Sequence, residues 1–513
     1  MLDLMKNSYK GKKVLIIQQR DWAKRIGHPL ACRLNQYGAD VGCVVIKSST
    51  MKFISNQMDF KYSFIKYADP IKDIGPGHLS ISGISLDDVC KGLGVDTVWT
   101  LVQSSRNHVK NYKEKFYYSY RQGMTDEWLE AFIKATYKHV CEVVDHFNPD
   151  IIFMPNFAAL QQIMFSLIAR QRGIKLCGVV DSKVPGVFLF TESHLAQNTK
   201  FLSVAESLKK GNSQSGNYKK ALDFVDAQKK KLAPPNNIDI ASIVTKNTGY
   251  LDLLRGGVNV AINSCFFFVD LYLNKVINYK NKVSIDYRPP NILLRDEVSA
   301  WLNRYSAERR RYTALSEVKS YAYFPLQVQP EATIDVHATR FNNQLETARQ
   351  VAMSMPGDMT LVVKDHPNMS MRRSRSYLDK IQRLPNVKLV DFRISTIDVV
   401  RNAQLVISPS STTMFEAAYL GVPAIQLGEL GTARAYPNIW YQPVLHELPS
   451  TIKQVLSEWK MLDSEKYLHD LTCCVAAAYD TGFEANYSKV WSGDTSSDLE
   501  LILTAFLREG LIK

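Results

Sequence analysis

Two series of short apolar runs, each alternating with stretches of helical periodicity, constrain the fold of this 513-residue chain more than any other feature. The first series begins with the runs at 14–17 and 41–46, and the second begins at 321–324. Short apolar runs separated by helices are typical of buried parallel strands in a doubly wound sheet. The chain is therefore expected to be α/β, with two Rossmann-like domains.

The alternation also divides the chain into segments of different character. Residues 205–245 are rich in Gly, Ser, Asn and Lys, as in a linker, and the pattern from about 248 to 318 is helical. We expect an N-terminal Rossmann-like acceptor domain at 1–204, a linker and helical segment at 205–318, a C-terminal Rossmann-like domain at 319–445 and a helical tail at 446–513. Strands are expected at 14–17, 41–46, 97–102, 151–154, 176–180, 321–324, 361–363, 387–390, 405–407 and 424–427.

An apolar stripe lies in the helical segment. Val258, Ile262, Cys265, Phe266 and Val269 share one face of a helix, which suits packing in a core or contact with a membrane. Polar residues interrupt the surrounding run, which is too short and too polar to cross a bilayer. The N-terminus lacks the apolar segment of a signal peptide. We therefore expect a cytoplasmic protein, and attachment to the cytoplasmic membrane face stays open.

The chain carries 63 Lys and Arg against 50 Asp and Glu, a formal net charge of +13. This surplus attracts anions without choosing among nucleic acid, acidic lipid and phosphorylated small molecules. The basic clusters at 229–231, 309–311 and 372–375 are interpreted as solvated faces, and without any nucleic-acid-binding signature we expect no nucleic acid partner. The eight cysteines lack a CxxC pair, so they are interpreted as small buried residues in a reducing compartment, and no metal site is expected.

Lys364, His366 and Pro367 follow the apolar run at 361–363. Ligands of open α/β sheets bind at the carboxyl ends of the strands. A lysine and a histidine at this place can hold phosphate, and His366 can protonate or stabilise a leaving group as a catalytic residue. The alternative interpretation is a loop histidine that caps the next helix.

A hydroxyl-rich loop joins the strand at 405–407 to a helix that carries Glu416, and it contains Ser410, Ser411, Thr412 and Thr413. One serine can cap the helix, and the free N–H groups at its positive end favour phosphate. Glu416 can accept hydrogen bonds from ribose hydroxyls. Taken alone, the loop is equally well explained as a plain helix cap.

A third element, Phe324–Glu331, follows the first strand of this half, and Gln329 and Glu331 are expected to point into the same cleft. The alternative is a structural turn. The His366 and serine loops follow strands that are one strand–helix unit apart, so they can converge on one ligand. Because the chain has no GxGxxG after its first strand, no Walker A motif and no Asp-x-Asp motif, we expect phosphate to be held by helix ends, Lys364 and His366 without a required metal ion.

These motifs resemble those of the capsule polysaccharide biosynthesis family, which includes 3-deoxy-manno-octulosonate (Kdo) transferases. The His-Pro pair followed by paired serines is also similar to the nucleotide-binding motifs of bacterial sialyltransferases, which use CMP-sugars. The resemblance extends over about residues 320–430, where Asp365 replaces a frequent Glu of the family and Ser411-Thr412-Thr413 replaces a frequent Gly-Thr. The strings that carry it are Phe324–Glu331, Val363–Pro367, Pro385–Val387, Ser410–Glu416 and Gly421–Pro423.

The resemblance implies a GT-B type glycosyltransferase whose domains face each other across a cleft. It favours a CMP-sugar donor, leaves UDP- and GDP-sugars open, and requires no further cofactor. The acceptor would be a surface polysaccharide or lipid-linked glycan, at the inner membrane surface or in an assembly complex. A polyol-phosphate transferase, a sugar-nucleotide epimerase and a non-catalytic assembly partner are the alternatives. The residues implied to contact the nucleotide are His366, Pro367, Ser410, Ser411 and Thr412 at the phosphate and Glu416 at the ribose.

The N-terminal half is expected to bind the acceptor and to supply the catalytic base. Asp21 and Glu192 are the two predicted bases, and a surface or capping role is the alternative for each. The further polar candidates after strands of this half are Arg20, His28, Asn156 and Asp181.

Overall fold

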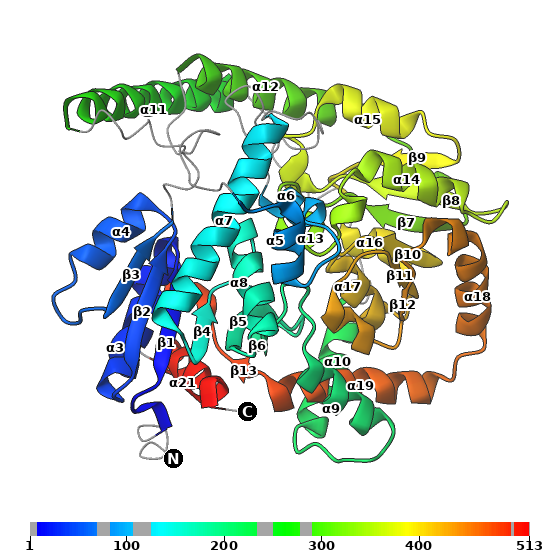
Figure 1. Cartoon of the computed structure of the whole chain (residues 1–513). Helices are drawn as coiled ribbons and strands as arrows, with labels where there is room; N and C mark the ends of the chain where they lie inside the picture. The colour runs from blue at the N-terminus through cyan, green and yellow to red at the C-terminus, as the bar shows by residue number, and fades with distance from the viewer. Residues whose placement is uncertain are drawn as a thin grey trace.

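The computed structural model describes residues 8–68, 83–105, 125–232, 250–277, 290–493 and 497–511. In this part of the chain, two mostly parallel sheets of seven and six strands form the centres of two α/β domains. Figure 1 shows the N-terminal domain in blue and cyan and the C-terminal domain in yellow and orange. The expected α/β class with two Rossmann-like domains is confirmed.

The N-terminal sheet has the order β13-β6-β5-β4-β1-β2-β3. Its parallel strands β3-β2-β1-β4-β5 follow the strand order of a dinucleotide-binding Rossmann sheet, and β6 and β13 add an antiparallel edge. The strands are β1 (Lys13–Gln18), β2 (Asp40–Val45), β3 (Phe64–Tyr67), β4 (Ile151–Met154), β5 (Lys175–Asp181), β6 (Val187–Thr191) and β13 (Phe483–Glu484).

Alternate residues of β1 serve two cores, one on each face of this sheet. Leu15 and Ile17 belong to one core, and Val14 and Ile16 belong to the other. The expected strand at 97–102 is wrong, because these residues enter helix α6 and pack Leu101 and Val102 into the first core. The helices are α2 (Arg20–Trp22), the π-helix η1 (Ala23–Gly27), α3 (His28–Gln36), α4 (Ser48–Ser55), α5 (Leu86–Leu93), α6 (Trp99–Ser105), α7 (Asp126–Phe147) and α8 (Leu160–Gln171).

The C-terminal sheet has the order β12-β11-β10-β7-β8-β9, with β7 in the middle. From β7 the chain adds β8 and then β9 on one side. It then crosses to the other side of β7 and adds β10, β11 and β12 in turn. This is the complete strand order of a Rossmann sheet, and its switch point lies between β7 and β10. The strands are β7 (Tyr321–Pro325), β8 (Thr360–Lys364), β9 (Val387–Val390), β10 (Leu405–Ser408), β11 (Ala424–Gln426) and β12 (Ile439–Tyr441).

Short helices connect these strands. The α17 helix ends at Gly421, whose φ of 68° is the left-handed conformation that glycine adopts without strain. The helices are α13 (Ala332–Asp335), α14 (Gln344–Met353), α15 (Arg375–Gln382), α16 (Thr396–Arg401) and α17 (Thr413–Leu420), with 3-10 turns η6 (Leu315–Glu317), η7 (Thr339–Phe341), η8 (Pro367–Met369), η9 (Gly431–Ala435) and η10 (Leu445–Glu447).

The C-terminal tail connects the two domains. Its helix α18 (Leu448–Lys460) packs on the C-terminal core, and α19 (Ser464–Thr481) packs with α9 (Thr199–Lys209) and α10 (Tyr218–Leu232). After α20 (Tyr487–Ser492), the last helix, α21 (Ser497–Leu511), returns to the N-terminal sheet. There the Phe506 ring lies 6.2 Å from Trp22 and 5.4 Å from Phe153. The stretch expected as a linker thus contains the end of α9 and all of α10, and residues 233–249 lie outside the described residues.

Helices α11 (Tyr250–Ile277) and α12 (Pro290–Glu308) lie along one side of the molecule and form a hairpin that extends past the sheets (Figure 1). Of the 22 large apolar side chains exposed among the described residues, eight lie on α11 and four on α12. The predicted stripe is among them: Val258 is 59% exposed, Ile262 50%, Phe266 54% and Val269 54%. The interpretation of this stripe as core is therefore wrong. Within the described residues, none of the helices combines the length and apolar character required to span a bilayer.

Candidate functional site

Three loops meet at the carboxyl ends of the neighbouring strands β10, β7 and β8. They enclose a pocket of 360 Å³ at the switch point of the sheet, where open α/β sheets bind ligands. The three sequence motifs thus converge on one pocket. The predicted site residues that line it are Glu331, Lys364, His366, Ser411, Thr412, Thr413 and Glu416.

Lys364 is the last residue of β8 and only 3% exposed. Within the described residues, its ammonium group forms no ion pair or hydrogen bond. Burial lowers the pKa of Lys364 to about 8, although the charges of Asp365 and Glu416 counteract part of this effect. A cation without a paired carboxylate at the wall of a pocket favours an anionic ligand.

His366 is half-buried, and its ring orientation is set by the backbone. Its Nδ1 accepts a hydrogen bond from the Asn368 N–H at 3.1 Å, so the proton of the neutral ring lies on Nε2. Burial, together with the charges of Lys364 and Arg373, lowers the pKa of His366. At neutral pH the ring is therefore an uncharged Nε2–H donor at the pocket. The capping role considered as an alternative is present, and it leaves Nε2 free for a ligand.

A buried ion pair fixes the loop that carries these two residues. Asp365 accepts hydrogen bonds from the Arg373 guanidinium and from the His366 N–H, the latter at 2.8 Å. Arg373 also donates to the Gln327 carbonyl at 2.7 Å, which ties the β8 loop to the β7 loop. Arg373 is 1% exposed, so the interpretation of residues 372–375 as a solvated face is wrong at this position. The sequence contains no pattern that distinguishes this buried arginine from its exposed neighbours.

The serine loop places the start of α17 at the pocket. Ser411 Oγ accepts a hydrogen bond from the Thr413 N–H at 3.2 Å and donates to Thr413 Oγ1 at 3.1 Å. Thr412, beside them, also lines the pocket. The positive end of the helix dipole and the hydroxyl groups favour a phosphate at this point. Ser410 does not line the pocket, and its buried Oγ has no hydrogen-bond partner within the described residues.

Two carboxyl groups, of Glu331 and Glu416, also line the pocket. Burial raises the pKa of Glu416, and Lys364 offsets part of that effect. Glu331 Oε2 accepts a hydrogen bond from Thr333 Oγ1 at 3.0 Å. These oxygens can accept hydrogen bonds from sugar hydroxyls, so the pocket combines phosphate donors with hydroxyl acceptors.

Gln329 does not point into the pocket, which corrects that expectation. Its side chain is 1% exposed, and its amide donates to Asp335 Oδ1 at 3.0 Å and accepts from Gln344 Nε2 at 3.2 Å. A buried amide needs both groups satisfied, and this network satisfies them inside the fold. Pro367 is exposed and begins the turn after His366.

The two predicted bases lie away from this pocket. Asp21 is exposed, with its carboxylate 3.8 Å from the Lys24 ammonium group. Glu192 lines a second pocket, of 580 Å³, together with Arg170 and Lys175. Neither carboxylate lines the 360 Å³ pocket, so the assignment of a base remains a prediction.

A third pocket, of 660 Å³, lies between the two domains. Thr97, Arg170 and His194 contribute from the N-terminal half, and His337 and Glu429 contribute from the C-terminal half. Burial lowers the pKa of both histidines to about 4, so they are neutral at physiological pH. Because Arg170 also lines the pocket of Glu192, the two spaces adjoin.

Comparisons with known proteins give distant structural matches. No protein-family model and no curated protein matches the chain. The β-Kdo 2,4 transferase KpsC of Thermosulfurimonas dismutans is 11% identical, with a TM-score of 0.34 over 70% of this chain and 87% of that one. The β-Kdo 2,7 transferase KpsC of the same organism is 12% identical, with a TM-score of 0.30 over 72% and 89%.

A UDP-GlcNAc 2-epimerase from Methanocaldococcus jannaschii is also similar. It is 12% identical, with a TM-score of 0.24 over 87% of this chain and 92% of that one.

Proposed function

We propose that this protein is a glycosyltransferase that binds a nucleotide-sugar in the 360 Å³ pocket. One observation carries the proposal: the buried cation of Lys364, the Nε2–H of His366 and the start of α17 all meet there. Each of these groups binds phosphate, and they lie at the switch point of a Rossmann sheet.

The same groups account for catalysis of sugar transfer. When the bond between the sugar and the phosphate breaks, negative charge develops on the departing phosphate oxygen. Lys364 and the Nε2–H of His366, which both line the pocket, would donate to that oxygen, and fixed donors of this kind stabilise developing charge strongly. Glu416, on the first turns of α17, would accept the ribose hydroxyls.

For the donor, we propose a CMP-sugar first and UDP- or GDP-sugars as the other classes. We propose that no metal ion or further cofactor is required, because Lys364, His366 and the α17 dipole supply the positive charge that phosphate needs. The acceptor, a growing glycan or lipid-linked glycan, would lie in the 660 Å³ pocket between the domains. A base from the N-terminal half, Asp21 or Glu192, would reach it as the domains close.

We further propose that the α11–α12 hairpin holds the protein on an anionic membrane surface. Its exposed apolar side chains suit insertion at the boundary between headgroups and acyl chains. At the end of α12, Arg309 lies exposed over the Tyr305 ring at 3.7 Å, and the chain as a whole carries a net charge of +13. The apolar face would supply the membrane contact, and the net charge of the chain would favour an anionic surface.

Vesicle sedimentation tests the membrane proposal. The double variant Ile262→Asp/Phe266→Asp should lose binding to anionic vesicles, whereas Met461→Asp, at an even more exposed apolar site outside the hairpin, should keep it. The membrane proposal would be contradicted if wild-type protein did not bind anionic vesicles. It would also be contradicted if the hairpin were buried in a stable dimer.

The reaction is tested by supplying CMP-, UDP- and GDP-sugars with glycan acceptors and identifying products by mass spectrometry. We expect an acceptor lengthened by one sugar, with release of the nucleotide. An epimerised nucleotide-sugar would show that the protein is an epimerase, and a transferred phosphopolyol would show that it is a polyol-phosphate transferase. Turnover that is unchanged in a His366→Asn variant would contradict the assignment of the pocket.

A further inference from the structure

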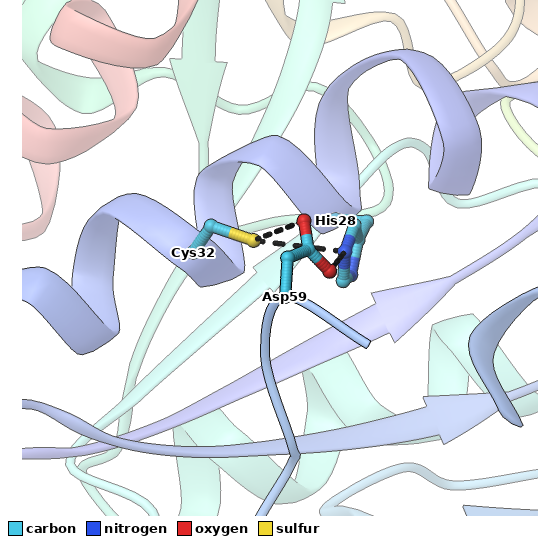
Figure 2. A group of neighbouring side chains, drawn as sticks. All are labelled: His28, Cys32 and Asp59. Atoms are coloured by element: carbon cyan, nitrogen blue, oxygen red, sulfur yellow. Dashed lines mark hydrogen bonds and ion pairs between the residues drawn. The ribbon is translucent and has the colours of Figure 1, made fainter. Parts of the chain in front are cut away.

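Three chemically different side chains converge in the N-terminal domain, outside the pocket described above. His28 is the first residue of α3, Cys32 lies one turn later on the same helix, and Asp59 lies in the loop between α4 and β3. Figure 2 shows the imidazole, thiol and carboxylate turned toward one another. His28 Nε2 lies 3.0 Å from Asp59 Oδ1 and 3.6 Å from Cys32 Sγ, and Cys32 Sγ lies 3.7 Å from Asp59 Oδ2.

These separations are those of ligands around one small metal ion. In a tetrahedral zinc site, nitrogen and oxygen ligands lie at about 2.0–2.1 Å and sulfur at about 2.3 Å, which places neighbouring ligand atoms about 3.3–3.6 Å apart. The observed separations of 3.0, 3.6 and 3.7 Å, in which His28 Nε2 faces Asp59 Oδ1 and Cys32 Sγ faces Asp59 Oδ2, differ from this by a few tenths of an ångström. The three ligand atoms all lie within 4.8 Å of one another.

The arrangement differs from a nucleophile–base relay. A relay uses opposite nitrogens of the imidazole, one for the nucleophile and one for the carboxylate. Here Cys32 and Asp59 both face Nε2 of His28, and Nδ1 is engaged by Tyr62 Oη at 3.1 Å.

A second layer of residues holds the imidazole in place. Gln18, at the end of β1, donates from Nε2 to Tyr62 Oη at 3.0 Å, and Tyr62 in turn contacts His28 Nδ1. The rings of Phe53 and Phe60 pack around the imidazole with centroids at 5.8 and 6.4 Å. Metal-binding histidines characteristically have their other nitrogen fixed by such a partner.

The backbone and the exposure of the cluster fit an ion site that opens to solvent. The π-helix η1 ends at Gly27, directly before His28, and π-helical turns occur often at functional sites. A Cβ atom on Gly27 would lie 2.2 Å from Gln18 Oε1 and 2.4 Å from the Trp22 ring, so a larger residue here would displace one of these side chains. The Asp59 side chain is 63% exposed, whereas that of His28 is 6% exposed, which leaves a path for an ion and a water ligand.

We propose that His28, Cys32 and Asp59 bind a Zn²⁺-type divalent ion, with a fourth position open to water. One nitrogen, one thiolate and one carboxylate suit zinc better than magnesium or calcium, which prefer oxygen ligands alone. The ion would connect α3 to the loop that precedes β3, at the carboxyl end of β1. The site is separate from the nucleotide pocket, and its test does not depend on the proposed reaction.

Cobalt substitution tests the proposal directly. Full-length protein is stripped with a chelator and titrated with Co²⁺, and a thiolate-to-cobalt charge-transfer band should grow to one equivalent. Cys32→Ser should abolish the band, whereas Cys90→Ser, at a cysteine of similar partial exposure, should leave it unchanged. Competition with Zn²⁺ should then remove the band with the same stoichiometry.

Two more variants keep the proposal testable if Cys32→Ser fails to fold. Asp59→Asn changes an exposed side chain and should remove most Zn²⁺ affinity, and Tyr62→Phe should weaken it by about 10- to 100-fold, as expected for a second-layer partner. Absence of a stoichiometric Co²⁺ band in folded wild-type protein, or a band that persists in Cys32→Ser, would overturn the assignment.

Discussion

Replacing Lys364 by Met is expected to stabilise the ligand-free protein while weakening nucleotide binding. The pKa of Lys364 is about 8 in the fold and 10.5 in its ordinary state, so below pH 8 the protonated side chain disfavours folding. At about 1.4 kcal/mol for each pH unit between these values, the cost is about 3 kcal/mol at neutral pH. It decreases as the pH rises from 8 toward 10.5. Met has a similar length and carries no charge, so the variant removes this cost.

Urea unfolding at pH 7, with and without nucleotide, measures both effects. Lys364→Met should raise the free energy of unfolding of the C-terminal domain by up to about 3 kcal/mol and should lose most of the stabilisation that nucleotide gives. Lys388→Met, at an exposed lysine of the neighbouring strand β9, should change neither quantity. A Lys364→Met protein that is less stable than wild type and still binds nucleotide would refute the argument, because it would show that the lysine has a structural role.

The remaining predictions concern the pocket and its support. Nucleotide affinity should be constant below about pH 7 and fall as the pH rises through 8, to about tenfold weaker at pH 9, because phosphate binds protonated Lys364; a flat calorimetric profile would contradict this. Ser411→Ala should weaken binding by about 1 kcal/mol in the same titration, and an unchanged dissociation constant would remove Ser411 from the phosphate site. Arg373→Met should destabilise the protein by about 3–5 kcal/mol in urea, because Asp365 is left buried without its partner, and Arg373→Met/Asp365→Leu should recover much of that loss.

Nine of the strands could be predicted because their signals are local, whereas β3, β6, β12 and β13 were not expected. Buried parallel strands appear as short apolar runs, and ten such runs were expected, of which the run at 97–102 forms the helix α6 instead. The loops after β7, β8 and β10 could be placed together because the carboxyl ends of neighbouring parallel strands meet at one edge. Lys364, His366, Ser411 and Glu416 were therefore found from the sequence.

Features that depend on contacts distant in the sequence could not be predicted. Gln329 is a polar residue of the kind found in binding sites, but its orientation depends on Asp335, which accepts a hydrogen bond from its amide, and on Gln344, which donates one to it. Arg373 is identical in type to its exposed neighbours, and only the fold shows that it is buried against Asp365. The cluster of His28, Cys32 and Asp59 offered one local signal, a histidine and a cysteine four residues apart, while its third member comes from another loop.

For the α11–α12 hairpin, the sequence predicted the helical face correctly but did not show whether that face is buried. The spacing of Val258, Ile262, Phe266 and Val269 correctly predicted one helical face, but periodicity does not show what covers that face. In the structure α11 packs along α12 and leaves these side chains exposed. Of the two interpretations of this stripe, packing in a core and contact with a membrane, the exposed side chains agree with the second.

The central claim, that nucleotide phosphate binds at Lys364, His366 and the start of α17, is tested most directly by thermal-shift measurements with CMP, CDP, UDP, GDP and ADP. The variant His366→Asn serves as the comparison, because Asn keeps an oxygen that can accept the Asn368 N–H and lacks the Nε2–H. We expect one nucleotide, at about 100 times its dissociation constant, to stabilise wild-type protein by about 2.7 kcal/mol, and to do so far less in His366→Asn. No stabilisation by any of the five nucleotides, or equal stabilisation of both proteins, would contradict the account.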